Sequence, residues 1–280
     1  MRFGVLILPD APWRQARRRW QAAERLGFDH AWTYDHLTWR SLRDGPWFGA
    51  IPTLTAAATV TSRIRLGTMV TSPTFREPVP LAKELMTLDD ISDGRITAGI
   101  GAGGDGFDAT ATRNNAWSRR ERTERFEEFV EQLDRLLTEP AASVHGRYYV
   151  ANDARAIPGC RQKPRLPFAI AATGSRSLRV AARHGAAWVS SDSRGAGLEL
   201  VKRLEEACAA EGRDPATIDR IVLVGHQERP LASVEAFRDV AGRYAESGFT
   251  DLVAHWPRPD EPFAGDEAVL ERIGADVLRP

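Results

Sequence analysis

The sequence predicts an α/β protein, a single (β/α)8 TIM barrel. Short apolar runs typical of strands alternate eight times with stretches typical of helices, and the second half of the chain repeats this alternation without interruption. Dividing 280 residues by eight pairs gives 35 residues per pair, which suits a barrel of roughly 250 residues with insertions. No shift in composition marks a boundary, so we expect one domain over 1–280. A doubly wound open sheet has the same local pattern and is the alternative.

The first two strand–helix pairs are bounded by residues typical of turns. Gly27 follows the first apolar helical face and ends that helix. A tryptophan-bearing loop to Gly49 follows the second strand, and it is the first of three predicted insertions. The expected strands are Phe3 to Leu8 and His30 to Tyr34, and the expected helices are Pro12 to Leu26 and Pro52 to Val60.

The stretch from Arg63 to Gly104 predicts strand, loop, helix, turn and strand. An apolar run from Ile64 to Val70 breaks at Thr71, and the prolines at 78 and 80 stand where a first helical turn needs no amide hydrogen. Asp93-Gly94 ends that helix, and the next apolar run leads into Gly101. Two strands joined by a helix are parallel neighbours, so their carboxyl ends open on the same face.

The remaining pairs follow after two further insertions, one after the fourth strand and one before the fifth. We expect an irregular rim over 105–118 and a hairpin-like insertion over 143–167. The other expected strands are Phe168 to Ala172, Ala187 to Ser191, Ile218 to Gly225 and Thr250 to His255. The other expected helices are Arg119 to Leu137, Ser175 to His184, Gly197 to Glu211, Ser233 to Ser247 and Glu267 to Ile273.

The charge balance argues for a small-molecule partner. Lys plus Arg and Asp plus Glu both number 38, so no overall basic field attracts nucleic acid or an anionic membrane. Cys160 and Cys208 lack the spacing of a disulfide framework or a metal site, which indicates a reducing, cytoplasmic location. The longest uncharged run, 45–62, contains two prolines and several hydroxyl residues, so it is not a membrane span.

Polar groups follow the predicted strands where a barrel enzyme keeps its chemistry. His36 is the best candidate for acid–base work, because imidazole titrates near neutrality. Asp35 is adjacent on the strand and so points the other way, which favours a structural role. His226 and His255 follow other strands, and Trp32, Trp39 and Trp47 could line an apolar pocket or belong to the core.

Two loops could hold a ligand. Thr173 to Ser177 combines a helix start, a glycine, hydroxyls and a guanidinium, which suits a phosphate, although an ordinary helix cap gives the same pattern. The glycines at 101–106 are not a dinucleotide fingerprint, since no helix follows promptly. They fit a flat ring packed on bare backbone, or a loop without a ligand.

Several segments together resemble the luciferase-like monooxygenase superfamily, and within it the F420-dependent oxidoreductases, which are (β/α)8 barrels. The resemblance covers nearly the whole chain. The matching segments are WTYDH at 32–36, RIRLGTMVTSPTFREPVPLAKELMTLDDISDGR at 63–95, GIGAG at 99–103, ATGSRSLRVAARHGAAW at 172–188 and FTDLVAHWP at 249–257.

The resemblance implies a homodimeric enzyme that moves a hydride between F420 and a small organic substrate, with His36 as the catalytic proton relay. It implies a cis peptide at Met69-Val70. It also implies that a sugar phosphate is not the substrate, because those relatives have a glutamate where this chain has Gly104. Reduction of a C=C, C=N or C=O bond is therefore expected. The candidate cofactor-binding residues are Asp35, Met69, Val70, Thr71, Gly101, Ala102, Gly103, Thr173, Gly174, Ser175, Arg176 and Ser177.

Two alternatives stay open. An FMN-dependent monooxygenase of the same superfamily would use oxygen and reduced flavin. A barrel that binds a flavin or a metabolite without catalysis belongs to another class, although barrels of this size are overwhelmingly enzymes.

Overall fold

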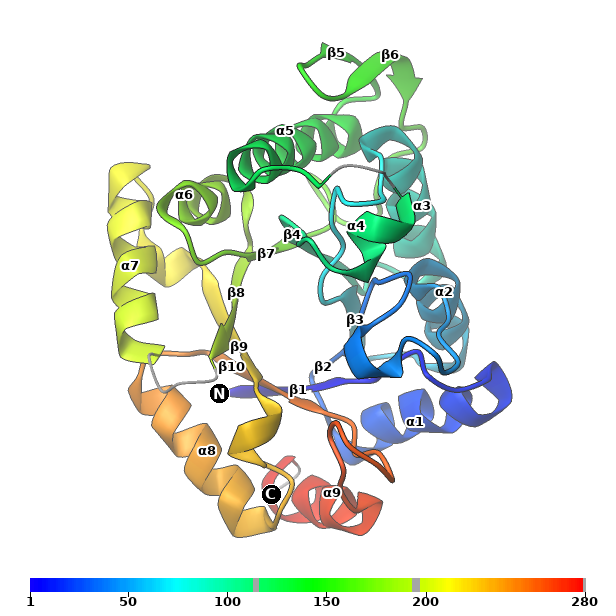
Figure 1. Cartoon of the computed structure of the whole chain (residues 1–280), viewed down its shortest axis with the longest axis vertical. Helices are drawn as coiled ribbons and strands as arrows, with labels where there is room; N and C mark the ends of the chain where they lie inside the picture. The colour runs from blue at the N-terminus through cyan, green and yellow to red at the C-terminus, as the bar shows by residue number, and fades with distance from the viewer. Residues whose placement is uncertain (113–115, 193–196, 279–280) are drawn as a thin grey trace.

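The computed structural model describes residues 1–112, 116–192 and 197–278. Its parallel strands close into a barrel in the order β1-β10-β9-β8-β7-β4-β3-β2. Figure 1 looks along this barrel, with the helices forming a ring outside the strands. The predicted (β/α)8 barrel is confirmed, and the open sheet is wrong.

The barrel strands lie close to the predicted runs. They are β1 (Arg2–Leu6), β2 (His30–Thr33), β3 (Arg65–Thr68), β4 (Ile96–Gly101), β7 (Phe168–Ala171), β8 (Ala187–Asp192), β9 (Asp219–Val224) and β10 (Asp251–His255). The surrounding helices are α1 (Trp13–Leu26), α2 (Ala50–Val60), α3 (Pro78–Ile91), α5 (Arg119–Thr138), α6 (Ser175–His184), α7 (Gly197–Ala210), α8 (Val234–Glu246) and α9 (Glu267–Ile273).

Three segments outside this alternation shape the ends of the barrel. The loop after β2 contains a short 3-10 turn, Arg40–Leu42. The segment after β4, predicted as irregular, instead forms a helix, α4 (Phe107–Thr112), and positions 113–115 of it lie outside the described residues. The insertion before β7 contains an antiparallel hairpin, β5 (Ala141–His145) and β6 (Val150–Arg155), which lies beyond α5 at the top of Figure 1.

Apolar side chains form two sets on either side of the barrel wall. The larger set fills the space between strands and helices, and includes Trp20 and Phe126. The smaller set fills the barrel itself, where Leu6, Trp32 and Val253 are buried. The alternation of side chains along each strand separates the two sets.

A buried ion network ties β1, β2 and β10 together at the amino end of the barrel. Asp251 is 1% exposed and accepts hydrogen bonds from Arg2 at 2.7 and 2.8 Å, while its Oδ1 lies 3.0 Å from Nε2 of His30. Burial alone would raise the pKa of Asp251. Hydrogen bonds from His30, Arg2 and Thr250 outweigh that effect and lower the pKa to about 2.

This network predicts a specific loss of stability in acid. The folded pKa of Asp251 lies below its unfolded value, so the stabilisation is present above about pH 4 and is lost as the pH falls toward 2. We expect Asp251→Asn to lower the free energy of unfolding at pH 7 by about 2 kcal/mol, and the difference from wild type to shrink between pH 4 and 2. Urea unfolding at several pH values measures this. The exposed Asp239→Asn is the control, and a pH-independent difference at Asp251 would rule out the assignment.

No helix in the described ranges is both long enough and apolar enough to span a membrane.

Candidate active site

The carboxyl ends of the strands bring His36 to the mouth of the barrel. Along β2 and the residues after it, side chains alternate between the interior and the helices. Trp32 and Tyr34 belong to the interior set, and His36 follows two positions later. Asp35 is out of phase with these residues, and its side chain accepts hydrogen bonds from Thr71 and Arg76.

His36 is held by a carboxylate that the sequence analysis did not identify. Nδ1 of His36 lies 2.5 Å from Oδ2 of Asp108, and Oδ1 of Asp108 accepts from the amides of Leu37 at 2.8 Å and Thr38 at 3.4 Å. A carboxylate at Nδ1 places the proton there and leaves the lone pair of a neutral imidazole on Nε2. Within the described ranges Nε2 has no hydrogen-bond partner, and the His36 side chain is 34% exposed, so a substrate can reach it.

Asp108 comes to His36 because α4 folds over the mouth. Thr112 Oγ1, on the last turn of α4, lies 3.3 Å from the carbonyl oxygen of Thr74, and the guanidinium of Arg43 lies 4.4 Å from the centre of the Phe107 ring. His36 and Asp108 are 72 residues apart in sequence. The acidic first turn of FDATAT was the available sign of a helix start, but no local pattern could pair it with His36.

Asp35 and Thr71 form a buried support behind the mouth. Asp35 is 2% exposed and Thr71 is 0% exposed. The Thr71 hydroxyl donates to Asp35 at 2.6 Å, and Arg76 donates to the same carboxylate at 2.7 and 3.0 Å. This network holds the residues that follow β2 and β3 together behind the mouth.

Bare backbone lies beside Val70. The Met69–Val70 peptide is cis, as the resemblance implies, and Met69 is buried in the barrel. A Cβ on Gly101 would lie 2.7 Å from Cγ2 of Val70, so only glycine fits there. Gly103 has a φ of 71°, and Ala102 between the two glycines is half-buried. These residues form a smooth surface on which a flat ring could lie.

The start of α6 has the features of an anion site, with one change from the prediction. Ser177 Oγ accepts from the amide of Gly174 at 3.2 Å, and Thr173 and Ser175 are exposed. The first amides of a helix have no partner within the helix. Arg176 does not point freely into solvent, because it is paired with Glu127 through Nε at 2.9 Å. The predicted cradle therefore keeps the exposed hydroxyls of Thr173 and Ser175, while the Gly174 amide and the Ser177 hydroxyl bond to each other and the Arg176 guanidinium is shared with α5.

Aromatic rings line the mouth next to His36. Trp39 stacks on Trp47 at 6.3 Å between centroids and on Phe263 at 5.9 Å, and Phe263 stacks on His255 at 3.5 Å. The Tyr34 hydroxyl lies 2.8 Å from Nε2 of His255. Burial raises the pKa of Tyr34, so its hydroxyl keeps its proton. A cavity of about 250 Å³ adjoins this group, with His255 and Phe263 in its wall.

One of the predicted aromatic candidates, Trp32, does not lie at this mouth. The Trp32 ring points toward the amino end of the barrel, where its Nε1 donates to Nδ1 of His30 at 2.6 Å. The side chain of His226 lies outside what the structure describes.

A model of the luciferase-like monooxygenase family matches residues 1–260 of this chain. The chain belongs to this family. The resemblance found in the sequence is therefore confirmed. Several proteins similar to this chain are described as F420-dependent enzymes.

Two of these luciferase-like relatives are described as F420-dependent glucose-6-phosphate dehydrogenases. The relative from Kineococcus radiotolerans is 32% identical over 77% of this chain and 65% of its own length. The relative from Beutenbergia cavernae is 29% identical, over 91% of this chain and 90% of its own length. The chain thus spans less than two thirds of the first relative and most of the second.

The luciferase-like barrel also matches solved structures in its fold. The coenzyme F420-dependent tetrahydromethanopterin reductase from Methanopyrus kandleri superimposes with a TM-score of 0.81 at 20% identity, and the match covers 99% of this chain and 98% of the reductase.

Proposed function

We propose that this chain is an F420-dependent oxidoreductase in which His36, held by Asp108, relays a proton at the mouth of the barrel. The observation that carries the proposal is the 2.5 Å contact between Nδ1 of His36 and Asp108, which leaves Nε2 of the partly exposed ring for a substrate. The relatives support the choice of cofactor, because they are described as F420-dependent.

The residues at the mouth fit a deazaflavin. The surface made by Val70, Gly101 and Gly103 suits a flat ring, and the start of α6 suits the phosphate of F420. When bound, F420 supplies or accepts the hydride, and the protein supplies orientation and protons. Asp35 and Thr71 support the wall behind Val70 through the hydrogen bond between them.

The roles of the protein side chains follow from the hydrogen bonds. Nε2 of His36 takes a proton from a substrate hydroxyl in the oxidative direction, or returns one to the substrate in the reductive direction. The carboxylate of Asp108 stabilises the positive charge that forms on the imidazole in the first case. The backbone amides of Leu37 and Thr38 keep that carboxylate in place.

We propose that the substrate is a small, largely apolar compound with a C=C, C=N or C=O bond that reduced F420 reduces. The rings of Trp39, Trp47 and Phe263 offer apolar faces next to His36. At Gly104, where the resemblance implies a glutamate in the sugar-phosphate enzymes, a Cβ would meet nothing within 4 Å. This position therefore offers no group for a sugar hydroxyl.

Exchange of the carboxylate at position 108 tests the relay. An asparagine amide could accept a hydrogen bond from Nδ1 of His36 or from the backbone amides, but no longer from both. We expect Asp108→Asn to lower kcat by about 100-fold, because the imidazole loses its fixed tautomer. The dissociation constant of F420 should stay the same. Asp105→Asn is a matched control three residues earlier in the chain, since Asp105 pairs with Arg122. Equal effects of the two exchanges would contradict the assigned role.

A charge placed at the start of α6 tests the phosphate site. Ser175 is exposed in the first turn, where an aspartate favours the helix. We expect Ser175→Asp to weaken F420 binding by about 5-fold to 10-fold through repulsion of the phosphate. The phosphate-free deazaflavin fragment of F420 should bind wild type and variant equally. Equal weakening of both ligands would place the phosphate elsewhere.

The proposed reaction is tested by turnover. Purified protein is mixed with reduced F420 under nitrogen together with a panel of enones, imines and ketones, and the return of oxidised F420 absorbance is followed. We expect substrate-dependent oxidation without oxygen. Product formed only with reduced FMN and oxygen would instead identify the monooxygenase. Oxidised F420 with glucose 6-phosphate is included, and reduction of F420 there would overturn the substrate class.

We also propose that residues 1–280 act as one domain in a homodimer, in the cytoplasm. The family resemblance supports the dimer. Cys160 and Cys208 are free and buried, which suits a reducing compartment. Sedimentation of the purified protein at several concentrations tests the oligomeric state, and a monomer at all of them would contradict the dimer.

A further inference from the structure

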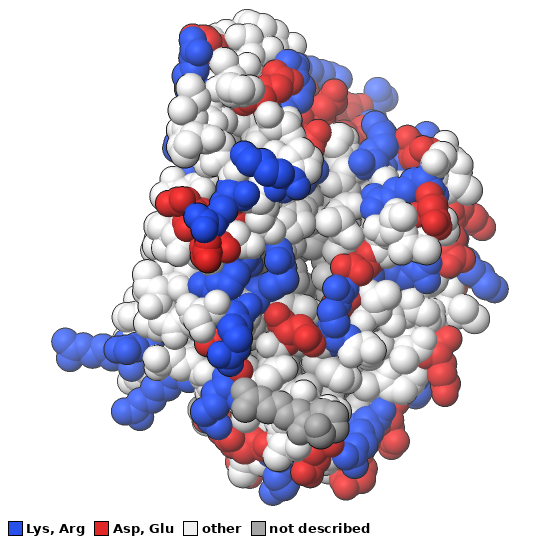
Figure 2. Space-filling model, turned by 180° about the vertical axis from the view of Figure 1, so that it is seen from behind, with Lys and Arg blue, Asp and Glu red and all other residues white. Residues whose placement is uncertain are grey.

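A second large cavity lies at the amino end of the barrel, opposite to His36. Its volume is about 600 Å³, which is within the usual range for small-molecule sites. It is lined by the first residues of the strands, among them Arg2, His30, Arg65 and Asp219. Figure 2 shows this end of the molecule, where basic side chains and a few acidic ones surround the middle of the face.

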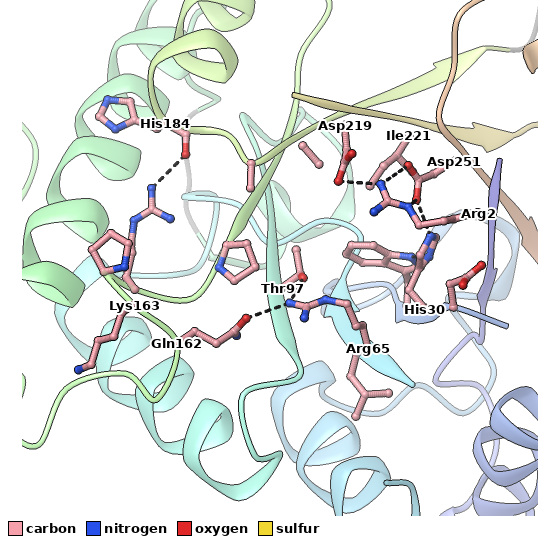
Figure 3. Close-up of a pocket in the computed structure, with 18 of the residues that line it drawn as sticks. Arg2, His30, Arg65, Thr97, Gln162, Lys163, His184, Asp219, Ile221 and Asp251 are labelled. Carbon is pink, nitrogen blue, oxygen red and sulfur yellow. Dashed lines mark hydrogen bonds and ion pairs between the residues drawn. The ribbon is translucent and has the colours of Figure 1, made fainter. Parts of the chain in front are cut away.

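Most charges around this cavity neutralise one another. Arg2 pairs with Asp251 and Asp219, both at 2.7 Å, and the close-up shows these three side chains together on one wall (Figure 3). Both nitrogens of His30 are used, one by Asp251 and the other by the indole of Trp32. The charges of Arg2, Asp219 and Asp251 therefore balance one another within the wall.

Arg65 differs from these residues because it lacks an acidic partner among the described residues. Its Nη2 makes three hydrogen bonds there, the shortest to Gln162 at 3.0 Å, and no carboxylate of the described ranges lies within ion-pair distance. Burial lowers the pKa of Arg65. A guanidinium has five N–H donors, and Nε and Nη1 of Arg65 have no acceptor in this part of the chain.

Arg95 shows that burial alone does not explain the missing acceptors. It too has no carboxylate partner in the described ranges, yet its Nε, Nη1 and Nη2 all donate, to the carbonyl oxygens of Ser92, Ala58 and Ile64 and to Thr61. Every nitrogen of the Arg95 guanidinium therefore has an acceptor within the protein. The guanidinium of Arg65 has two nitrogens without an acceptor among the described residues, and it lies at the edge of a cavity.

The floor of the cavity is apolar. Trp32, Leu66 and Ile221 line it. The Trp32 ring is fixed, because a Cβ on Gly67 would lie 2.4 Å from it and its Nε1 is bonded to His30. What it offers to the cavity is an apolar face. The exposed Lys163 stands at the rim and adds a positive charge.

We propose that this amino-end cavity is a second binding site, for a compact organic anion whose carboxylate or phosphate is held by Arg65 and whose apolar body packs on Trp32. A planar acid group matches the fork of a guanidinium, and Lys163 attracts the anion as it enters. The site is separate from the mouth and does not depend on the proposed function.

Titration with benzoate, phenyl phosphate and neutral benzyl alcohol tests the site, followed by ligand-observed NMR. We expect the anions to bind wild type and benzyl alcohol to bind far more weakly. Arg65→Gln should weaken the anions at least about 10-fold, as expected for the loss of a charge-assisted hydrogen bond. The exposed Arg17→Gln on α1 is the matched control. No binding to wild type, or equal binding to the Arg65 variant, would overturn the proposal.

Two further experiments keep the test valid if the Arg65 variant misfolds. One uses a surface variant, and the other locates the bound anion directly. Lys163 is exposed, so Lys163→Glu should fold normally and weaken the anions about 5-fold. Crystals soaked with 4-bromobenzoate should show the anomalous bromine signal over Trp32, with the carboxylate at Arg65. Bromine only at the mouth near His36, or an unchanged affinity in Lys163→Glu, would contradict the assignment.

Discussion

Replacement of His36 by alanine is expected to lower kcat with reduced F420 by about 100-fold or more, because a positioned general acid or base contributes that much. The dissociation constant of F420 should change little, since the ring is expected to lie on Val70 and the glycines near Gly101. Anaerobic turnover and a fluorescence titration measure the two quantities.

The control for His36→Ala is His145→Ala, an exposed histidine on the β5–β6 hairpin. A double variant, His36→Ala with Asp108→Asn, should be no worse than His36→Ala alone, because the carboxylate acts through the imidazole. Unchanged turnover in His36→Ala would remove the assigned role. Additive losses would show that Asp108 acts independently of His36.

Replacement of Gly99 by alanine is expected to destabilise the barrel by about 3 kcal/mol or more, because overpacking against rigid backbone cannot relax. A Cβ at this position would lie 1.8 Å from the carbonyl oxygen of Thr68. The two residues also exchange hydrogen bonds through the Thr68 hydroxyl, at 2.9 and 3.1 Å. The strands β3 and β4 would have to separate to make room.

Gly242→Ala is the matched control for Gly99→Ala. Gly242 lies within α8, and a Cβ there would meet nothing within 4 Å. Alanine should stabilise that helix by up to about 1 kcal/mol, because glycine is a poor helix former. Urea unfolding of the two variants should therefore give changes of opposite sign. Equal stabilities would show that β3 and β4 are not held as close as described.

The alternation of apolar runs was sufficient to predict the barrel, because each strand and helix leaves a local signal. The same local rule placed His36 at the mouth and turned Asp35 away from it. The pairing of His36 with Asp108 depends on how α4 folds over the mouth, and nothing near either residue encodes that contact.

Other differences have the same physical origin. Arg176 was predicted as a phosphate ligand from its neighbours in sequence, and its pairing with Glu127 on the adjacent helix could not be predicted in the same way. Trp32 was grouped with Trp39 and Trp47 because all three are near in sequence. The barrel instead turns Trp32 toward His30, since both face the interior from the same strand. Charge pairs and ring directions between distant elements need the tertiary structure.

The most direct test of the proposed cofactor is a parallel titration of the purified apoprotein with F420 and with FMN, each followed by its own fluorescence. We expect tight binding of F420 and much weaker binding of FMN, with the F420 affinity reduced in Ser175→Asp. Preference for FMN would rule out the proposed cofactor and assign the chain to the oxygen-using enzymes of its family.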